Sequence, residues 1–215
     1  MFKKLVEAGM NAARAVPLTP AEPLPPKLPI FPLRGGVLMP SGSLPLRVGR
    51  PETISLVQAV GVGGVLVALP LRRADATELT ADAFFGTGCF ARIVLIQPSE
   101  GTLMVVLQGI RRVRVTSVLH GSAAVHEQPD EPAVNSKDAA ELTALYRKAM
   151  KRPPVASERD WEDFLRRIEH ATPGDQTFAI ASNLNLPFET QQQLFELTDP
   201  RTRIVRLRKA LEEVR

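Results

Sequence analysis

The hydrophobic pattern of this chain changes from mainly strand-like to helical close to Pro129, and that change constrains the fold more than any other feature. Upstream, short apolar runs such as 64–69, 89–96 and 103–107 are bounded by glycine, proline or polar turns, which is typical of buried strands and hairpins. Downstream, apolar residues recur every three or four positions, which is typical of amphipathic helices. Strands followed by helices predict an α+β protein with segregated elements rather than alternating βαβ units.

The segment before the first strand adds a third part. Residues 1–16 have the spacing of a short amphipathic helix, and a proline-rich stretch over 17–29 follows. Prolines at this density stiffen a chain and prevent regular pairing. We therefore expect an N-terminal helix and connector over residues 1–27, a β domain over 28–130 and a helical bundle over 131–215. Two interpretations of the first helix stay open, a loosely attached extension or a helix that docks on a partner subunit.

Local signals predict where individual elements begin and end. A helix is expected from Pro51 to Gly61, because proline suits a first helical position and glycine a helix end. The turn residues 98–101 predict a hairpin. We expect Gln108-Gly109 to break the apolar run that follows, with a separate strand from Ile110 to Val118.

The helical part carries capping signals. Thr172-Pro173 and Asp199-Pro200 predict helix starts, because an oxygen-bearing side chain caps and a proline follows. Ser157 is expected to cap another helix. The apolar spacing of the last helix, Ile204, Leu207, Leu211 and Val214, suits either a coiled-coil seam or packing within a bundle, and we favour the bundle because the repeat is short.

Composition and charge exclude several classes of protein. No run of 18 apolar residues occurs, so no transmembrane helix is expected. The single cysteine, Cys89, excludes a disulfide framework and favours a reducing cytoplasm. Residues 1–130 hold 13 Lys+Arg against 9 Asp+Glu, whereas residues 131–215 hold 14 of each. This basic surplus is too small to demand a nucleic-acid partner.

The motifs of the common enzyme classes are missing from the sequence. There is no Gly-Lys-Ser/Thr phosphate loop, no Gly-x-Ser-x-Gly elbow, and no second histidine four residues after His126. Cys89 lies in an apolar run and is expected to be a core residue rather than a nucleophile. Asp160 and Asp163, one helical turn apart, are expected to be solvated. We therefore predict no catalytic residue, no cofactor and no metal site.

A cluster of arginines is the main basic feature. In a strand, Arg112 and Arg114 share one face, and Arg111 lies on the other. A surface for single-stranded nucleic acid would also need aromatic side chains between the charges, and none lies nearby. Solvated charges at a sheet edge are therefore favoured over phosphate binding.

Several motifs occur in an order that resembles the N-terminal substrate-binding domain of Lon proteases. The most specific is Leu28-Pro29-Ile30-Phe31-Pro32-Leu33-Arg34 with Val37 and Pro40, followed by Pro45-Leu46-Arg47-Val48-Gly49-Arg50. Further similar segments are 86–93, 101–106, 108–115, 178–184 and 191–196, with Arg203 and Leu207. Gly35-Gly36 after the arginine, and Gln108 in place of an acidic residue, depart from the family pattern and mark a divergent relative.

The resemblance implies a PUA-like β pseudo-barrel followed by a C-terminal helical bundle. It also implies recognition of unfolded or tagged protein segments. The chain ends at Arg215, where the ATPase module of Lon would begin. We therefore expect a stand-alone protein that lacks the ATPase and protease domains.

Candidate binding residues follow from this role. A binder of varied polypeptides needs exposed apolar side chains of adaptable shape. Met39, Leu71, Phe84 and Phe85 lie in expected loops and are the candidate polypeptide-binding residues. For the two phenylalanines we favour the alternative that they close the end of the barrel.

Three functions stay open at this point. The leading one is a non-catalytic recognition module, an adaptor or chaperone-like factor, whose partners are unfolded or tagged polypeptides together with a protease or chaperone. The second is RNA or DNA binding, because PUA-like barrels in other families hold RNA and the β part carries the basic surplus. The third is a small-molecule enzyme or sensor with an interior pocket, which no motif supports. No membrane partner is expected.

Overall fold

The computed structural model describes residues 23–131, 135–150 and 158–213. They form two compact units, one ending at Gln128 and the other beginning at Pro129. The expected helix over 1–16, residues 17–22 of the proline-rich connector, and the expected cap Ser157 lie outside the described residues. Within the described residues, no helix is long and apolar enough to cross a membrane.

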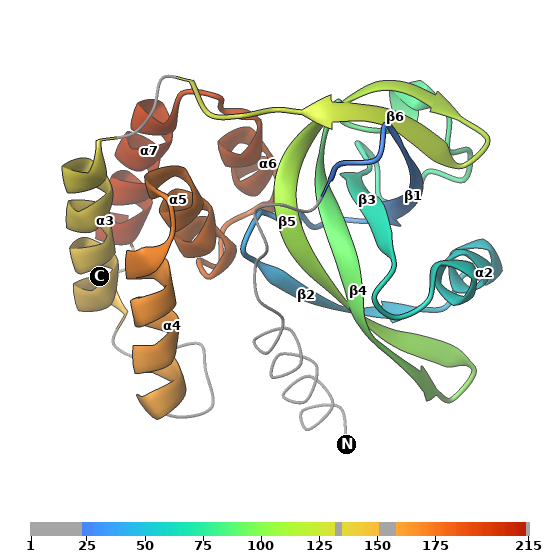
Figure 1. The fold of residues 1–215 in the computed structure, drawn as a ribbon, viewed down its shortest axis with the longest axis horizontal. Coiled ribbons are helices and arrows are strands. Elements are labelled where there is room, and N and C mark those ends of the chain that lie inside the picture. Colours follow the sequence, from blue (N-terminus) through green and yellow to red (C-terminus); the bar gives the residue numbers. More distant parts are fainter. Residues whose placement is uncertain (1–22, 132–134, 151–157, 214–215) are drawn as a thin grey trace. The chain divides into compact units, whose positions relative to one another are not determined.

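The first unit is built on one sheet that closes on itself. Its strands are β1 (Lys27–Leu33), β2 (Ser43–Val48), β3 (Val65–Pro70), β4 (Thr87–Ser99), β5 (Thr102–Leu119) and β6 (Ser122–Glu127), in the order β2-β5-β4-β3-β1-β6 (Figure 1). Because β5 also pairs with β6, five strands make a closed pseudo-barrel, and β2 pairs with β5 outside that ring. β1 and β3 are parallel, and the other pairs are antiparallel. The predicted α+β class with a β pseudo-barrel is confirmed.

β5 is one bulged strand and not two. It runs through Gln108-Gly109, where the sequence suggested a break, and Ile110 is the extra residue between the Gly109–Ala91 and Arg111–Phe90 pairs. A bulge bends a strand without ending it. Gly109 is needed at this bend because a Cβ there would clash with the backbone carbonyl of Met39. The glycine therefore marks a close approach of the 39–42 loop, which a single sequence does not distinguish from a strand end.

Turn and helix signals in this unit are confirmed. Glu100 and Gly101 have positive φ angles of 42° and 75° and join β4 to β5 through the Ser99–Thr102 pair. Such a pair of left-handed residues matches the twist of a two-residue hairpin. The helix α2 (Pro51–Val60) begins at the expected proline and ends before Gly61. A short 3-10 helix, η1 (Ala81–Ala83), precedes β4.

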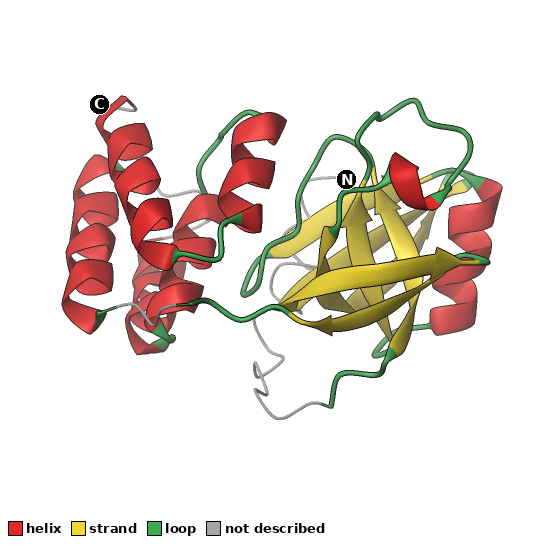
Figure 2. Cartoon of the chain, turned by 90° about the horizontal axis from the view of Figure 1, so that it is seen from above, coloured by secondary structure: helices red, strands yellow, loops and turns green. Residues whose placement is uncertain are grey.

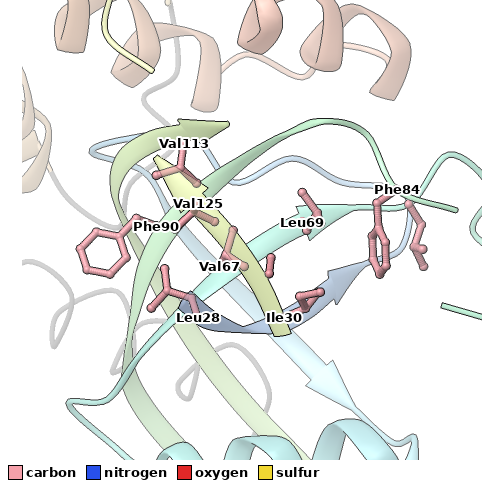
Figure 3. Packing of buried hydrophobic residues seen from close by; sticks show 10 residues of the cluster. Leu28, Ile30, Val67, Leu69, Phe84, Phe90, Val113 and Val125 are labelled. Atoms are coloured by element: carbon pink, nitrogen blue, oxygen red, sulfur yellow. The ribbon is translucent and has the colours of Figure 1, made fainter. Parts of the chain in front are cut away.

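Buried apolar side chains from every strand of the ring fill the barrel. The cluster consists of Leu28, Ile30, Val67, Leu69, Leu71, Phe84, Phe90, Val113, Ala123 and Val125. Figure 3 shows Leu28 and Ile30 on β1 beside Val67 and Leu69 on β3, as their parallel pairing requires. The alternation of apolar residues along short strands thus places one apolar face of each strand inside the ring.

The second unit is a bundle of helices, coloured red in Figure 2. They are α3 (Ser136–Ala149), α4 (Glu158–His170), α5 (Pro173–Ser182), α6 (Phe188–Glu196) and α7 (Pro200–Glu213). Both predicted helix starts are confirmed: Thr172 Oγ1 accepts from Asp175 N at 3.2 Å, and Asp199 Oδ1 accepts from Arg201 N at 2.9 Å. α7 packs against α3 and α5, which supports the bundle interpretation over a coiled-coil seam.

A buried arginine ties the first residues of the helical unit to two of its helices. Arg203 of α7 is fully buried, and its Nη2 donates to Asp130 Oδ1 at 2.6 Å. Nη1 donates to Thr177 Oγ1 of α5 at 3.0 Å, and the guanidinium lies 3.8 Å from the Phe178 ring centroid. A side chain at Gly174 would meet the Asp130 carboxylate, so glycine there lets the carboxylate approach α5.

Candidate polypeptide-binding site

Three of the four predicted binding residues are buried. Met39, Leu71 and Phe84 are 1%, 0% and 3% exposed, so the expectation that they form an accessible surface is wrong. Leu71 and Phe84 pair as an isolated antiparallel bridge and belong to the barrel core. The loop between them folds back onto the end of β3, since Phe85 N donates to Pro70 O at 3.0 Å. Phe84 thus closes the barrel, as the favoured alternative had it.

Phe85 remains partly exposed. The guanidinium of Arg72 lies 4.7 Å from its ring centroid, a cation–π arrangement. Of the four candidates it alone keeps accessible surface, and its role in binding stays a prediction.

Arg34 holds the loop between Leu71 and Phe84 by hydrogen bonds to its backbone. It follows β1 directly, and its Nη1 donates to Ala74 O at 2.6 Å and Ala76 O at 2.8 Å. Partial burial and the nearby charge of Arg50 lower the pKa of the Arg34 guanidinium. Sequence reasoning gave Arg34 no role, and only its position at the end of the first strand could have suggested one.

The outer edge of β2 is an open edge of the described sheet. β2 pairs with β5 on one side, and no described strand pairs with the other side. Proline is accommodated in a sheet where its nitrogen faces away from the partner strand, so Pro45 directs its backbone groups outward. The backbone N–H and C=O groups of Ser43 and Arg47 also point outward, because successive residues of a strand direct these groups to alternate sides. Gly109 N donates to Gly42 O at 2.9 Å. This agrees with an arrangement in which the even-numbered residues of β2 direct their backbone groups toward β5.

The side chains of β2 combine apolar surface with a positive charge. Leu44 and Leu46 are partly exposed, and Arg47 is exposed. Leu46 lies opposite Val105 of β5, which in turn lies opposite Ile96 of β4, so an apolar row crosses three strands. Ile96 is also partly exposed. This edge and its row were missed by sequence reasoning, which noted only that the prolines favour an edge.

The arginine cluster is only partly solvated. Arg112 is 3% exposed, and its Nε donates to Gln128 O at 3.0 Å, so the prediction of a solvated charge is wrong for it. Gln128 N also donates to Arg112 O at 3.1 Å. Arg111 forms an ion pair with Glu127 at 3.3 Å, whereas Arg114 is exposed as expected. Two of the three charges are therefore engaged within the protein.

The residues considered for chemistry take ordinary positions. Cys89 is fully buried, and burial raises the pKa of its thiol, as suits a core residue. Asp163 is half exposed and lies 3.6 Å from Arg166, while the side chain of Asp160 lies outside the described residues. Among the described residues, no group of three or more histidine, cysteine or acidic side chains could hold a metal ion.

The comparison with protein families decides the relationship. The family model of the ATP-dependent protease La (LON) substrate-binding domain matches residues 27–213. The chain belongs to this family. The resemblance seen in the sequence is thereby confirmed, and the match includes strands β1 to β6 and helices α3 to α7.

Individual relatives of this Lon-family chain agree. Lon protease 2 of Myxococcus xanthus is 32% identical over 213 residues, which are 90% of this chain and 25% of the relative. The Lon protease of Anaeromyxobacter dehalogenans is 32% identical over 215 residues, 94% of this chain and 25% of the relative. The chain thus spans about a quarter of the length of these curated relatives.

Solved structures support the fold of the Lon-family chain. The N-terminal domain of a Mycobacterium avium complex Lon protease superposes with a TM-score of 0.63 at 17% identity, covering 87% of this chain and 98% of that one. A Lon N-terminal domain protein from Xanthomonas campestris gives 0.54 at 21% identity, covering 84% and 96%. At these identities the likeness concerns the fold alone.

Proposed function

We propose that this chain is a non-catalytic recognition module that binds unfolded or tagged polypeptide segments. The observation that carries the proposal is the extent of the family match, which runs from residue 27 to 213 and takes in both compact units. The matched family is named for substrate binding, and the relatives are Lon proteases. These similarities support recognition of a protein substrate as the proposed activity of this chain.

Two cellular roles fit such a module. As an adaptor it would hold a client for a protease, and as a chaperone-like factor it would keep the client from aggregating. Both need reversible binding to chains of varied sequence. Main-chain pairing supplies such binding because backbone groups are the same in every polypeptide, and the open edge of β2 offers them.

Binding of an unfolded model protein tests the proposal. Fluorescently labelled α-lactalbumin, held unfolded by reduction and carboxymethylation, is titrated with the full chain, and fluorescence anisotropy is followed. We expect saturable binding that ATP does not change, and none to native α-lactalbumin as the matched control. Failure to bind this or any other unfolded protein tried would contradict the proposal.

The nucleic-acid alternative makes a different prediction. Binding through phosphates weakens steeply as salt rises, because counterions are released. With Arg111 ion-paired and Arg112 buried, the cluster offers little for such contacts. We therefore expect labelled single-stranded RNA not to bind at physiological salt. Salt-sensitive RNA binding tighter than client binding would reverse this ranking.

A further inference from the structure

We infer that a client binds by adding a strand to the outer edge of β2, as an extended segment with alternating apolar residues and an acidic residue beside Arg47. The inference rests on the proposed function, since it specifies which polypeptide segments the module recognises and how it binds them. A sheet edge with unpaired backbone groups is a template for another strand. β2 is the strand of the described sheet that has a neighbour on one side only along its whole length.

The backbone of β2 defines what the client must provide. Its outer edge presents the N–H groups of Ser43 and Arg47 and the carbonyls of Ser43, Pro45 and Arg47, as deduced from the orientation of Pro45. A client strand pairs with this edge through its own backbone carbonyls and N–H groups, which also face β2 at every second residue. A proline at a client position that faces β2 removes a donor, so proline-poor segments are preferred.

The side chains of β2 define the pattern of the client. A strand added about 4.8 Å away places its side chains alternately in line with those of β2. An apolar client residue opposite Leu46 extends the row that runs through Val105 to Ile96. One opposite Leu44 extends the row through Leu107, which is fully buried. Both leucines are partly exposed, so the added residues would cover apolar surface.

Charge adds a preference for acidic residues. Arg47 and Arg50 are both exposed near the end of β2, and the strand itself holds no acidic residue. The nearest acidic residue along the sequence is Glu52, in the first turn of α2. Cross-strand pairs of opposite charge stabilise a sheet. An aspartate or glutamate facing Arg47 therefore favours one register of the client over the others.

A second copy of the chain suits this edge less well than a client. Pro45 leaves one acceptor of any added strand without a donor. Pairing two β2 edges brings two such prolines and loses two hydrogen bonds, whereas a proline-free client loses one. The same proline also limits uncontrolled edge pairing, as natural edge strands commonly do.

Two substitutions at one position test the inference. Arg47→Pro removes an outward N–H without removing a bond to β5, while Arg47→Ala removes the charge and keeps the N–H. With the unfolded α-lactalbumin probe, we expect Arg47→Pro to weaken binding at least about tenfold and Arg47→Ala by about threefold or less, since a hydrogen bond exceeds an exposed charge pair in free energy. Far-UV circular dichroism and the melting temperature establish that each variant is folded.

A second position covers the case in which Arg47→Pro fails to fold. Ser43 is the first residue of β2, where proline is best tolerated, so Ser43→Pro is compared with Ser43→Ala in the same titration. Proline variants that bind as tightly as the wild type overturn strand addition and leave the proposed function standing. A wild type that binds no unfolded protein overturns the proposed function itself. Sedimentation velocity tests whether a second copy occupies the edge. If the wild type self-associates and the proline variants do not, while client binding is unchanged, the occupant is a second copy and the inference is overturned.

Discussion

Removal of the Asp130 carboxylate is expected to destabilise the helical unit strongly. The Arg203 side chain is fully buried and that of Asp130 is 16% exposed, and the two form an ion pair at 2.6 Å. The guanidinium also donates to two neutral oxygens, those of Thr177 at 3.0 Å and Leu197 at 3.3 Å. Asp130→Ala therefore leaves a buried positive charge without its carboxylate.

The magnitude follows from burial. Breaking a buried ion pair by removing one partner costs about 3–5 kcal/mol, and each kcal/mol lowers the melting temperature of a domain of this size by about 4–8 °C. A decrease of at least about 12 °C is therefore expected. The exposed pair Arg208–Glu141, at 3.0 Å with side chains 39% and 51% exposed, gives a matched control. Glu141→Ala should cost less than about 1 kcal/mol.

The assay reads the helical unit alone. Trp161 is the chain's single tryptophan and is 8% exposed in α4, so its emission during urea unfolding follows this unit. The double variant Asp130→Ala with Arg203→Met should recover part of the loss, because no buried charge remains. A buried, charge-dependent role of Asp130 is contradicted if Asp130→Ala costs no more than Glu141→Ala, or if the double variant is no more stable than Asp130→Ala.

Further predictions concern Arg34, Tyr146 and Cys89. Arg34→Met should let trypsin cleave the 72–80 loop roughly tenfold faster, because about 1.4 kcal/mol of charged hydrogen bonding is lost; equal acceleration by Arg50→Met would contradict the specific role of Arg34. The hydroxyl of Tyr146 is buried with no hydrogen-bond partner among the described residues, so Tyr146→Phe should raise the free energy of unfolding by about 1 kcal/mol. Burial raises the pKa of Tyr146, so only the unfolded chain loses the phenolic proton above about pH 10. The free energy of unfolding of the wild type should therefore fall more between pH 8 and 10.5 than that of Tyr146→Phe. An equal decrease of the urea midpoint in both proteins would contradict this. The thiol of Cys89, with its pKa raised by burial, should react with a disulfide reagent at pH 8 only after denaturant is added, and rapid reaction of the native protein would mean that the core is open.

Features that depend on neighbouring residues in the chain were predictable from the sequence. The caps Thr172 and Asp199, and the turn at Glu100-Gly101, depend on residues within a few positions of one another, and each appears where it was expected. The change from a strand pattern to a helical pattern near Pro129 likewise predicted the segregation of the two units. The ordered motifs from Leu28 onward were enough to predict the family.

Which side chains are accessible depends on how the loops and strands pack in the folded protein. Met39, Leu71 and Phe84 lie in loop segments, yet the loops fold onto the barrel and bury them. Gly109 is a bend in β5 rather than its end because the 39–42 loop packs against it. The physical reason is that closure of the sheet joins residues that are far apart in the chain. β5 pairs with β6 to close the ring, and no described strand then pairs with the outer edge of β2. Alternation within a strand predicts two faces, but only the assembled sheet determines which strand keeps an unpaired edge.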